Sequence, residues 1–382
     1  MNRADVAVIG GGIVGLAYAW EAARRGKLVV LFERSPFAQA ASVRNFGMIW
    51  PIGQPPGEHH SLALRSRARW LELRDQARLS VEECGSLHVS HEDDEDAVLR
   101  EFAAKAPGVG IACTYLNAAD VLRRFPSVNP DGLRGGLFSA AELCVNPRSA
   151  IAQIPKYLRD VYRVDVRFGT GIASVEMPLI RTAAGETWHV ETAFVASGAD
   201  FESLFPEVFA QSGLIRCKLQ MLRTGAQPNG FRLGPHVAGG LTLCHYKSFE
   251  MCDSLKSLKV RVAGSHPRYV ELGIHVMAAQ NDAGHIVIGD SHEYGAAMSP
   301  FDKAEIDDLI LAYLRRMIRL PEWEIAERWH GVYAKHPTLA HFSAEPQPGC
   351  HIVSSPGGAG MTLSFGLAER WWAARDSEGG KR

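Results

Sequence analysis

The sequence predicts an α/β fold with an inserted α+β region built on an antiparallel sheet. A glycine-rich strand, helix and strand pattern opens the chain at residues 5–34. Short alternating apolar runs fill residues 218–290, and a second glycine-rich turn precedes a helix at residues 357–372. An apolar strand followed at once by a helix is typical of a parallel βαβ unit, whereas alternating runs are typical of antiparallel strands.

The opening segment, DVAVIGGGIVGLAYAWEAARRGKLVVLFER at residues 5–34, contains the parts of a dinucleotide-binding unit. Gly10 allows the sharp turn off the strand, and Gly12 lets the backbone approach a pyrophosphate. Gly15 lets the helix pack closely on the sheet. The spacing of strand, turn and helix therefore predicts a phosphate site.

The helix that follows the glycine turn supplies unpaired N–H groups and a dipole that favours anions at its N-terminus. Glu33, at the end of the second strand, can accept hydrogen bonds from both hydroxyls of an adenosine ribose. These features leave two cofactors open, NAD and FAD. A glycine-rich turn in an ordinary α/β protein is the alternative interpretation.

Length and composition predict an ordinary globular protein of about two domains. The 382 residues are 46% hydrophobic and 22% charged, with a formal net charge of -1. We expect no nucleic-acid or membrane partner, because there is no basic excess and no apolar run approaches the roughly 18 residues of a membrane span. The chain enters its first strand almost at once, so we expect no signal peptide and a cytoplasmic enzyme.

The seven cysteines are scattered and form no CxxC pair. This pattern predicts neither structural disulfides nor a metal site.

Residues 35–57 lack periodicity and are rich in glycine and proline, which predicts a functional loop. Arg44 and Asn45 supply hydrogen-bond donors, Gly47 permits close backbone approach, and residues 48–50 are apolar groups suited to a ring face. A packed surface loop is the alternative.

The remaining pattern predicts a first domain formed by residues 1–80, 145–215 and 321–382, and a second formed by residues 81–144 and 216–320. We expect helices over residues 60–83, 92–105, 118–125, from about 147, 302–320 and 361–372. We expect strands over residues 84–89, 164–175, 191–200 and 351–354. Between residues 218 and 290, the runs KLQMLRT, GLTLCHYKSF, RYVELGIHVMAAQ and HIVIGD predict antiparallel strands and hairpins.

In combination, these motifs resemble the D-amino-acid oxidase family of FAD enzymes, which includes glycine oxidase and sarcosine oxidase. The resemblance rests on the βαβ start, the loop at 42–48, the Ala-Ser-Gly step at 196–198 and the C-terminal glycine turn, and it covers residues 5–372. It implies a Rossmann-type FAD-binding domain with an inserted antiparallel sheet that forms the substrate chamber over the flavin.

The resemblance also implies the residues that contact FAD. The backbone of Ile172 would pair with adenine, and residues 357–362 would face the flavin pyrimidine ring, where a helix N-terminus stabilises negative charge. An NAD enzyme has no need of this second glycine turn, so FAD is favoured. The implied FAD contacts are Gly10, Gly12, Ile13, Val14, Gly15, Glu33, Arg34, Ser42, Arg44, Asn45, Phe46, Gly47, Met48, Ile172, Ser197, Gly198, Gly357, Gly358, Gly360, Met361 and Thr362.

In sarcosine oxidases a cysteine just ahead of a Y-x3-P pattern holds the flavin covalently. Here that pattern runs from Tyr333 to Pro337, and the matching position is Gly331. We therefore expect FAD to bind without a covalent bond.

The substrate side departs from the amino-acid oxidases. The position of their carboxylate-binding arginine is Tyr333 here, and the position of their lysine is Met361. Arg44 is the favoured anion ligand, because a forked guanidinium suits an oxyanion, although it could contact the FAD pyrophosphate instead. No catalytic residue is assigned. The candidate substrate-binding residues are Arg44, Met48, Trp50, His245, Tyr246, His275, Tyr333 and Lys335.

Two segments, RNFGMIWPIGQPPG and KLQMLRT, resemble one clade of the family that is associated with phosphonate breakdown and proposed to oxidise aminophosphonates. A phosphonate is tetrahedral and carries more charge than a carboxylate, so a different set of donors would be reasonable.

The resulting hypothesis is oxidation of the C–N bond of a small amine that carries an acidic group: an amino acid, an N-methyl amino acid or an aminophosphonate. Hydride would pass to flavin N5, the imine would hydrolyse, and O₂ or another acceptor would take the electrons. A flavin-dependent 2-hydroxy-acid dehydrogenase and a non-catalytic FAD-bearing sensor are the alternatives, and a plain NAD dehydrogenase is the least favoured.

Overall fold

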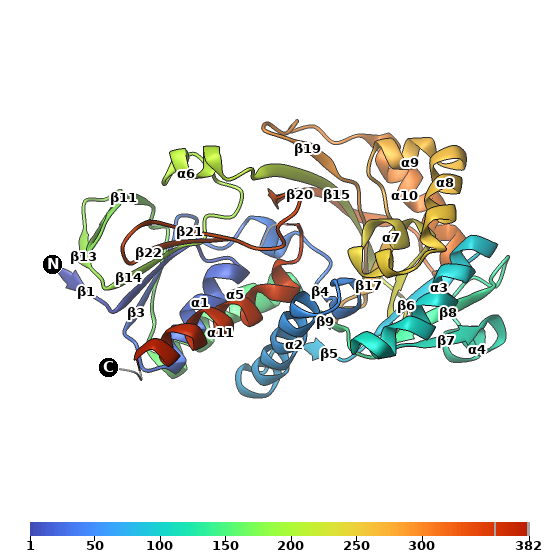
Figure 1. Ribbon diagram of the computed structural model, residues 1–382, viewed down its shortest axis with the longest axis horizontal. Helices are drawn as coiled ribbons and strands as arrows, with labels where there is room; N and C mark the ends of the chain where they lie inside the picture. Colours follow the sequence, from blue (N-terminus) through green and yellow to red (C-terminus); the bar gives the residue numbers. More distant parts are fainter. Residues whose placement is uncertain (355–356, 380–382) are drawn as a thin grey trace.

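The computed structural model describes residues 1–354 and 357–379, which form two lobes (Figure 1). The first lobe is built on a six-stranded sheet. Its first five strands are parallel and β21 is antiparallel to β22. In spatial order the strands are β10 (Asp165–Phe168), β3 (Val29–Glu33), β2 (Val6–Ile9), β14 (Thr192–Val195), β22 (Cys350–Ser354) and β21 (Phe342–Gln347).

Alternation along the strands gives this sheet two buried faces. Val6 and Val8 pack in a cluster with the helices α1 (Ile13–Arg24), α5 (Pro147–Tyr162) and α11 (Gly360–Gly379). Ala7 and Ile9 point to the other face and pack against a small four-stranded sheet. That sheet contains β1 (Asn2–Arg3), β13 (Thr187–His189), β12 (Leu179–Thr182) and β11 (Ile172–Glu176).

The second lobe contains a sheet of nine strands whose described pairings are antiparallel except that of β16 with β6. Its path is β19 (Glu293–Gly295), β15 (Ile215–Ala226), β18 (His285–Gly289), β17 (Met277–Gln280), β16 (His236–Ala238), β6 (Ser86–Ser90), β8 (Gly135–Ser139) and β7 (Thr114–Asn117), and β20 (Ile325–Lys335) pairs with β15. Helices α3 (Asp93–Lys105), α4 (Ala118–Arg124), α7 (Gly240–His245), α8 (Leu255–Ser265), α9 (Pro267–Glu271) and α10 (Ala304–Met317) accompany this sheet.

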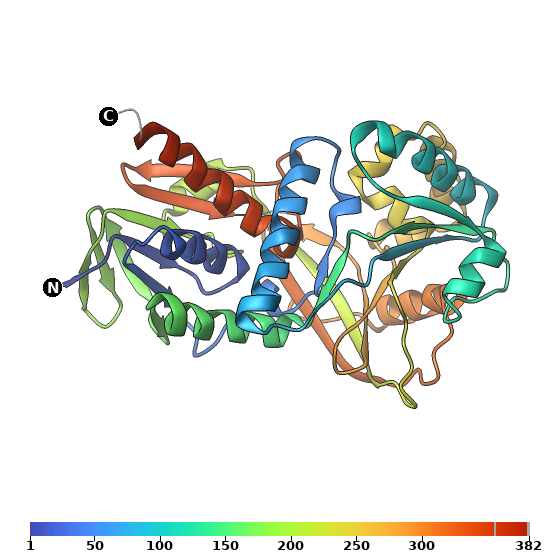
Figure 2. The same cartoon turned by 90° about the horizontal axis from the view of Figure 1, so that it is seen from below.

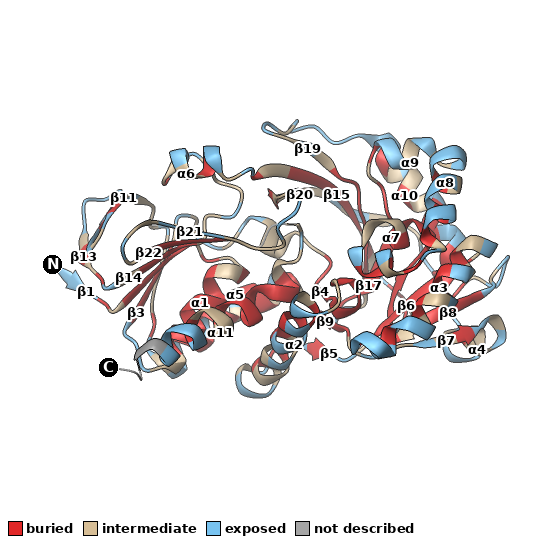
Figure 3. Cartoon of the chain, in the orientation of Figure 1, coloured by how far each residue is buried: buried red, intermediate tan, exposed pale blue. Residues whose placement is uncertain are grey.

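The two lobes meet along the long strands β15 and β20 and along α2 (Glu58–Ala77), which Figure 2 shows between them. A short sheet of β4 (Met48–Ile49), β9 (Leu143–Val145) and β5 (Val81–Glu82) lies at the same junction. Figure 3 shows that inner strands of both large sheets, such as β2, β16 and β17, are buried, whereas the edge strands β10, β21 and β19 contain no buried residue. Among the described helices, none has the length and apolarity needed to cross a bilayer.

The predicted fold class is confirmed: a parallel α/β lobe carries an inserted antiparallel sheet. The predicted domain boundaries stay a prediction, and residues 355–356 and 380–382 of the first domain lie outside the described part of the chain.

Several local predictions are wrong. The run at 240–249 forms α7 and the short 3-10 helix η4 (Lys247–Met251), and the run at 268–280 begins as α9 before it becomes β17. The helix α8 was not predicted. Its buried residues, Leu255, Leu258 and Val262, follow the three- and four-residue spacing of a helix face. The predicted helix at 60–83 ends at Ala77, and β5 follows it.

Candidate functional site

A continuous cavity of about 1030 Å³ lies between the two lobes. Gly10, Glu33 and Ile172 line one part of it, and Tyr246, His275 and Asp290 line another. The cavity therefore joins the predicted nucleotide site to residues of the antiparallel sheet. Its lining includes every predicted FAD and substrate residue except Gly15 and Gly47.

The N-terminal turn is shaped by glycines that have no room for a side chain. Gly10 has a φ of +117°, and a Cβ atom built on it would lie 2.3 Å from the Ala196 carbonyl oxygen. A Cβ atom on Gly15 would lie 1.9 Å from the Gly10 carbonyl oxygen, so this glycine serves the close packing of α1 on β2. Gly15 therefore lies behind the cavity wall.

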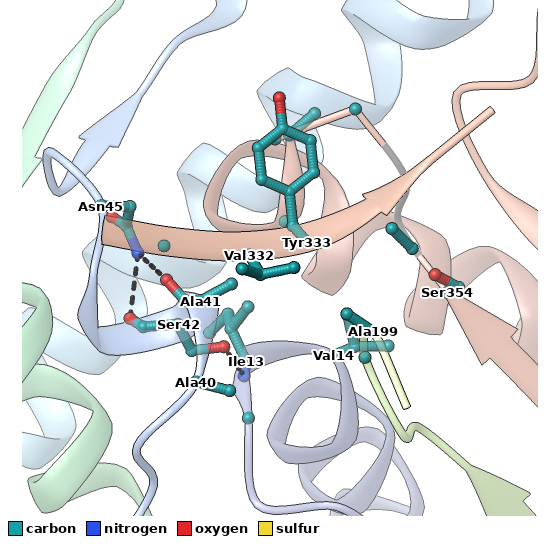
Figure 4. A pocket seen from close by; sticks show the side chains of 18 of the residues that line it. Ile13, Val14, Ala40, Ala41, Ser42, Asn45, Ala199, Val332, Tyr333 and Ser354 are labelled. Carbon is teal, nitrogen blue, oxygen red and sulfur yellow. Dashed lines mark hydrogen bonds between the residues drawn. The ribbon is translucent and has the colours of Figure 1, made fainter. Parts of the chain in front are cut away.

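The loop after β3 completes the phosphate side of the cavity (Figure 4). Ser42 Oγ accepts a hydrogen bond of 2.9 Å from the backbone amide of Ile13, in the first turn of α1. The amide of Asn45 donates to the carbonyl oxygens of Ala41 and Ser42, both at 3.0 Å, which fixes the short helix η1 (Ala41–Val43). The loop is therefore attached directly to the helix N-terminus.

Gly47 lies outside the cavity lining because its space is taken by the chain behind it. Its φ is +78°, and a Cβ atom on it would lie 1.9 Å from the Val145 carbonyl oxygen. Gly47 thus permits close approach of the loop to β9, whereas it was predicted to contact the cofactor.

The Glu33 carboxylate is held at the end of β3 by two backbone amides. Oε2 accepts from the Gly11 N–H at 2.8 Å, and Oε1 accepts from the Ser35 N–H at 2.9 Å. Each oxygen keeps a further lone pair for a ligand hydroxyl. The carboxylate lines the cavity together with Ile172 and Ser197.

The C-terminal glycine turn faces the same cavity. Gly357 and Gly358 have φ values of +91° and +74°. A Cβ atom on Gly358 would lie 3.5 Å from the Tyr333 hydroxyl, and one on Gly357 would lie 3.6 Å from Lys335 Nζ. Tyr333 and Lys335 are two residues apart on β20, so both side chains cover this turn.

Two hydrogen bonds connect the start of α11 to earlier parts of the chain. The Trp50 amide donates to Thr362 Oγ1 at 3.0 Å, and the Trp70 indole donates to the Met361 carbonyl at 2.8 Å. The loop after β3 and the C-terminal turn are therefore parts of one wall.

These residues fit a bound dinucleotide such as FAD. Neither α1 nor α11 has an acidic residue in its first turn, so both N-termini are free of side chains that would repel an anion. Gly10 has no room for a side chain, a Cβ atom on Gly12 would lie 2.9 Å from Ser42 Oγ, and Glu33 lines the cavity.

The part of the cavity beyond the C-terminal turn is rich in imidazole rings. His245 at the end of α7, His275 before β17 and His292 after β18 lie with ring centroids 3.9, 4.7 and 5.0 Å apart. Asp290 lies among them, with Oδ1 3.3 Å from His275 Nε2 and Oδ2 3.9 Å from His292 Nε2. We call these four residues the histidine–aspartate cluster.

Burial controls the pKa values of the cluster. It raises the pKa of Asp290 well above its usual range and lowers that of His292 to about 4. The pKa values of His245 and His275 fall well below the usual range, first through burial and then through neighbouring imidazoles and Lys335. These pKa shifts all favour the neutral form of the imidazoles.

Two further polar groups lie near the cluster. Burial lowers the pKa of Lys335, and the neighbouring Lys247 lowers it further. The Tyr333 pKa is raised well above its usual range by burial and then by the Cys217 thiol, which lies opposite it across β15 and β20. Figure 4 shows the Tyr333 ring extending away from Ile13 and Ser42.

The other predicted substrate residues also reach the cavity. The Arg44 guanidinium donates to the His330 carbonyl at 3.1 Å, and the Arg44 backbone packs against Gly331. The Trp50 ring lies 6.0 Å from the Tyr246 ring, centroid to centroid, and Met48 is buried beside the same core.

Lys247, a weaker candidate anion ligand beside His245 and Tyr246 in the sequence, also lines the cavity. Lining residues that were not predicted include Arg216, Met277, Asp290 and His292. A signal for the last two is the Asp-Ser-His step that directly follows β18, since polar residues at a strand end often belong to a site.

A family model described as FAD dependent oxidoreductase matches residues 5–374 of this chain. The chain is 26% identical over 214 residues to a glycine oxidase of Geobacillus kaustophilus (strain HTA426), covering 52% of this chain and 55% of the relative. It is 27% identical over 154 residues to an opine oxidase subunit of Rhizobium meliloti, covering 37% of this chain and 41% of the relative. These matches thus span about half the length of the curated relatives.

The fold resembles the crystal structure of glycine oxidase from Geobacillus kaustophilus. The TM-score is 0.76 at 19% sequence identity, and the match covers 98% of this chain and 94% of that one. This likeness extends over both lobes.

Proposed function

Because the chain belongs to the DAO family of FAD dependent oxidoreductases, we propose that it oxidises the C–N bond of a small amine that carries an acidic group. One observation carries the proposal: a continuous cavity joins the nucleotide-binding turns to a chamber lined by Lys335, Tyr333 and the histidine–aspartate cluster. Similarity to a glycine oxidase and to part of an opine oxidase supports an amine substrate.

When bound, FAD supplies a hydride acceptor, which is the chemistry that an amine C–H bond requires. Glu33 would hold the adenosine ribose, and Gly10, Gly12 and Ser42 would surround the pyrophosphate. Residues 357–362 would border the flavin ring. The start of α11 would there stabilise the negative charge that develops when the hydride is accepted.

The chamber residues would select and position the substrate. The Lys335 ammonium would attract the acidic group, and the Tyr333 hydroxyl would donate a hydrogen bond at the position where amino-acid oxidases of this family carry an arginine. Trp50, Met48 and Met277 would supply an apolar wall that limits the entry of water. This arrangement suits an amino acid, an N-methyl amino acid or an aminophosphonate.

In the proposed reaction, the α carbon of the neutral amine loses a hydride while the nitrogen lone pair forms the C=N bond. Water then adds to the imine, and a carbonyl compound and an amine or ammonia leave. The two electrons pass to O₂ or to another acceptor. We assign no general base, because positioning and electrostatics suffice for this chemistry.

The test is anaerobic reduction of the bound flavin by glycine, sarcosine, an aminophosphonate, a neutral alkylamine, lactate and 2-hydroxyglutarate. We expect bleaching by at least one acidic amine and not by the neutral amine or the hydroxy acids. Bleaching by hydroxy acids alone would favour a 2-hydroxy-acid dehydrogenase, and a flavin that no compound reduces would favour the sensor.

Two lysine variants separate substrate binding from folding. Lys335→Met should raise the concentration of acidic amine that is needed for half-maximal bleaching. Lys27→Met, at an exposed position outside the cavity lining, should leave this concentration unchanged. Equal behaviour of the two variants would remove Lys335 from the proposed substrate site.

A further inference from the structure

The histidine–aspartate cluster brings three imidazoles to one point of the cavity. One ring nitrogen from each of His245, His275 and His292 lies within 4.8 Å of the other two. The residues come from the end of α7 and from the segments that flank β17 and β18. Rotation about the side-chain bonds can bring such nitrogens to the roughly 2.0–2.1 Å that a bound zinc ion requires.

The hydrogen bond of His292 leaves one ring nitrogen available for a metal. Its Nδ1 lies 2.9 Å from the Gly273 carbonyl oxygen. Because a carbonyl oxygen can only accept, Nδ1 carries the proton and Nε2 keeps a free lone pair. A backbone carbonyl bound to the opposite nitrogen is the usual support of a metal-ligating histidine.

One ring nitrogen of the cluster lacks a partner among the described residues. His275 Nδ1 is buried and forms no hydrogen bond there, whereas Asp290 Oδ1 lies 3.3 Å from His275 Nε2 without a hydrogen bond of good geometry. The two side chains are only 5% and 7% exposed. Buried polar atoms without partners are rare, and they often mark a missing ion or water. The Asp290 carboxylate faces the Nε2 atoms of both His275 and His292, where a shared cation would satisfy it.

We propose that His245, His275 and His292 bind one divalent transition-metal ion, with Asp290 as the fourth ligand. Imidazole nitrogens with one carboxylate are ligands that Zn²⁺, Co²⁺ and Fe²⁺ accept. No metal site was predicted from the sequence, because the cysteines form no ligand motif and the three histidines are far apart along the chain.

The position of the ion would give it a role in substrate binding, and this part of the inference rests on the proposed function. The cluster and Lys335 line the same cavity, and Lys335 is close enough to act electrostatically on all three imidazoles. A phosphonate or carboxylate bound between the ion and the ammonium would meet positive charge on both sides. The ion would then supply the positive charge that an arginine supplies in the amino-acid oxidases of the family, since Tyr333 occupies that position here.

The first experiment measures metal binding without any substrate. The full-length flavin-loaded protein is freed of metal with a chelator and titrated calorimetrically with Zn²⁺ and with Co²⁺. We expect one ion per chain. The variants His275→Gln and His292→Gln should weaken binding by about 100-fold or more, since even indirect partners of a metal contribute 10–100-fold.

His189→Gln is the matched control, because His189 lies in β13 and outside the cavity lining. Flavin content and melting temperature show that each variant is folded. Absence of saturable binding to the wild-type protein would overturn the metal site, and so would equal binding by all three variants. The metal site would also be contradicted if the metal-free protein bound inorganic phosphate at this cluster and Zn²⁺ did not change the affinity for phosphate.

The second experiment tests the role of the ion. Metal removal should raise the KM for an acidic amine at least tenfold, and Zn²⁺ should restore it. An unchanged KM would overturn the substrate-binding role. If Zn²⁺ binds but no amine reduces the flavin, the proposed function fails and the metal site stands.

Discussion

Gly360 packs directly against Ile13, since a Cβ atom on Gly360 would lie 3.3 Å from Ile13 Cγ2. These residues belong to the first turns of α11 and α1, near opposite ends of the chain. Their contact brings two helix N-termini to one cavity, where both can face an anionic cofactor.

Gly10→Ala should remove most of the bound flavin. The new Cβ atom would meet the Ala196 carbonyl oxygen, and a φ of +117° is strained for alanine. The measurement is the ratio of flavin absorbance to protein absorbance after purification. Gly264→Ala, on α8 with no atom within 4 Å of the new Cβ, should keep the wild-type ratio. Full flavin content in Gly10→Ala would contradict the assigned phosphate turn.

Thr362→Val should lower the free energy of unfolding by about 1–3 kcal/mol. The substitution removes the hydroxyl that accepts a hydrogen bond from the buried Trp50 amide, and this bond joins the loop after β3 to α11. Urea unfolding and the dissociation constant of FAD measure the effect. Thr114→Val, at an exposed position of β7, serves as the control and should change neither.

The flavin should leave the protein when the chain is precipitated with acid. Among the described residues, no cysteine lines the cavity, and glycine occupies position 331. All seven cysteines are free. The colour of the supernatant checks this prediction, and flavin retained in the pellet would show a covalent link through another side chain.

The free energy of unfolding should fall as the pH drops below about 6.5. Burial lowers the pKa of His88 to about 3 and that of His236 to about 4, so the unfolded chain binds protons that the folded chain does not. Each such histidine adds a slope of up to about 1.4 kcal/mol per pH unit between its folded and unfolded pKa values.

Urea unfolding at pH 7.5 and 5.5 measures this slope. His88→Phe keeps a buried ring beside Trp50 and Phe249 but cannot bind a proton. Its stability should therefore depend less steeply on pH than that of the wild-type protein, and an identical slope would contradict the assignment.

The nucleotide side of the cavity could be predicted from sequence because its requirements are local. Gly10, Gly12 and Glu33 act through backbone space and through spacing along one βαβ unit. The role of Gly47 was not predicted correctly, because the space for a side chain there is limited by the Val145 carbonyl oxygen of another segment.

The chamber could be predicted only in part. His245 and His275 were expected there as separate residues, but residues 240–249 were assigned to a strand and they form α7 and η4. Asp290 and His292 follow the β17–β18 hairpin, which places Asp290 beside His275. Their meeting with His245 depends on where α7 packs, and α7 was not predicted.

A crystal structure of the purified, flavin-loaded protein tests the central claim most directly. We predict electron density for FAD along the cavity, with the adenosine ribose at Glu33 and the flavin ring between residues 357–362 and the chamber that contains Lys335. A nicotinamide dinucleotide in this groove, or a flavin bound elsewhere, would contradict the account.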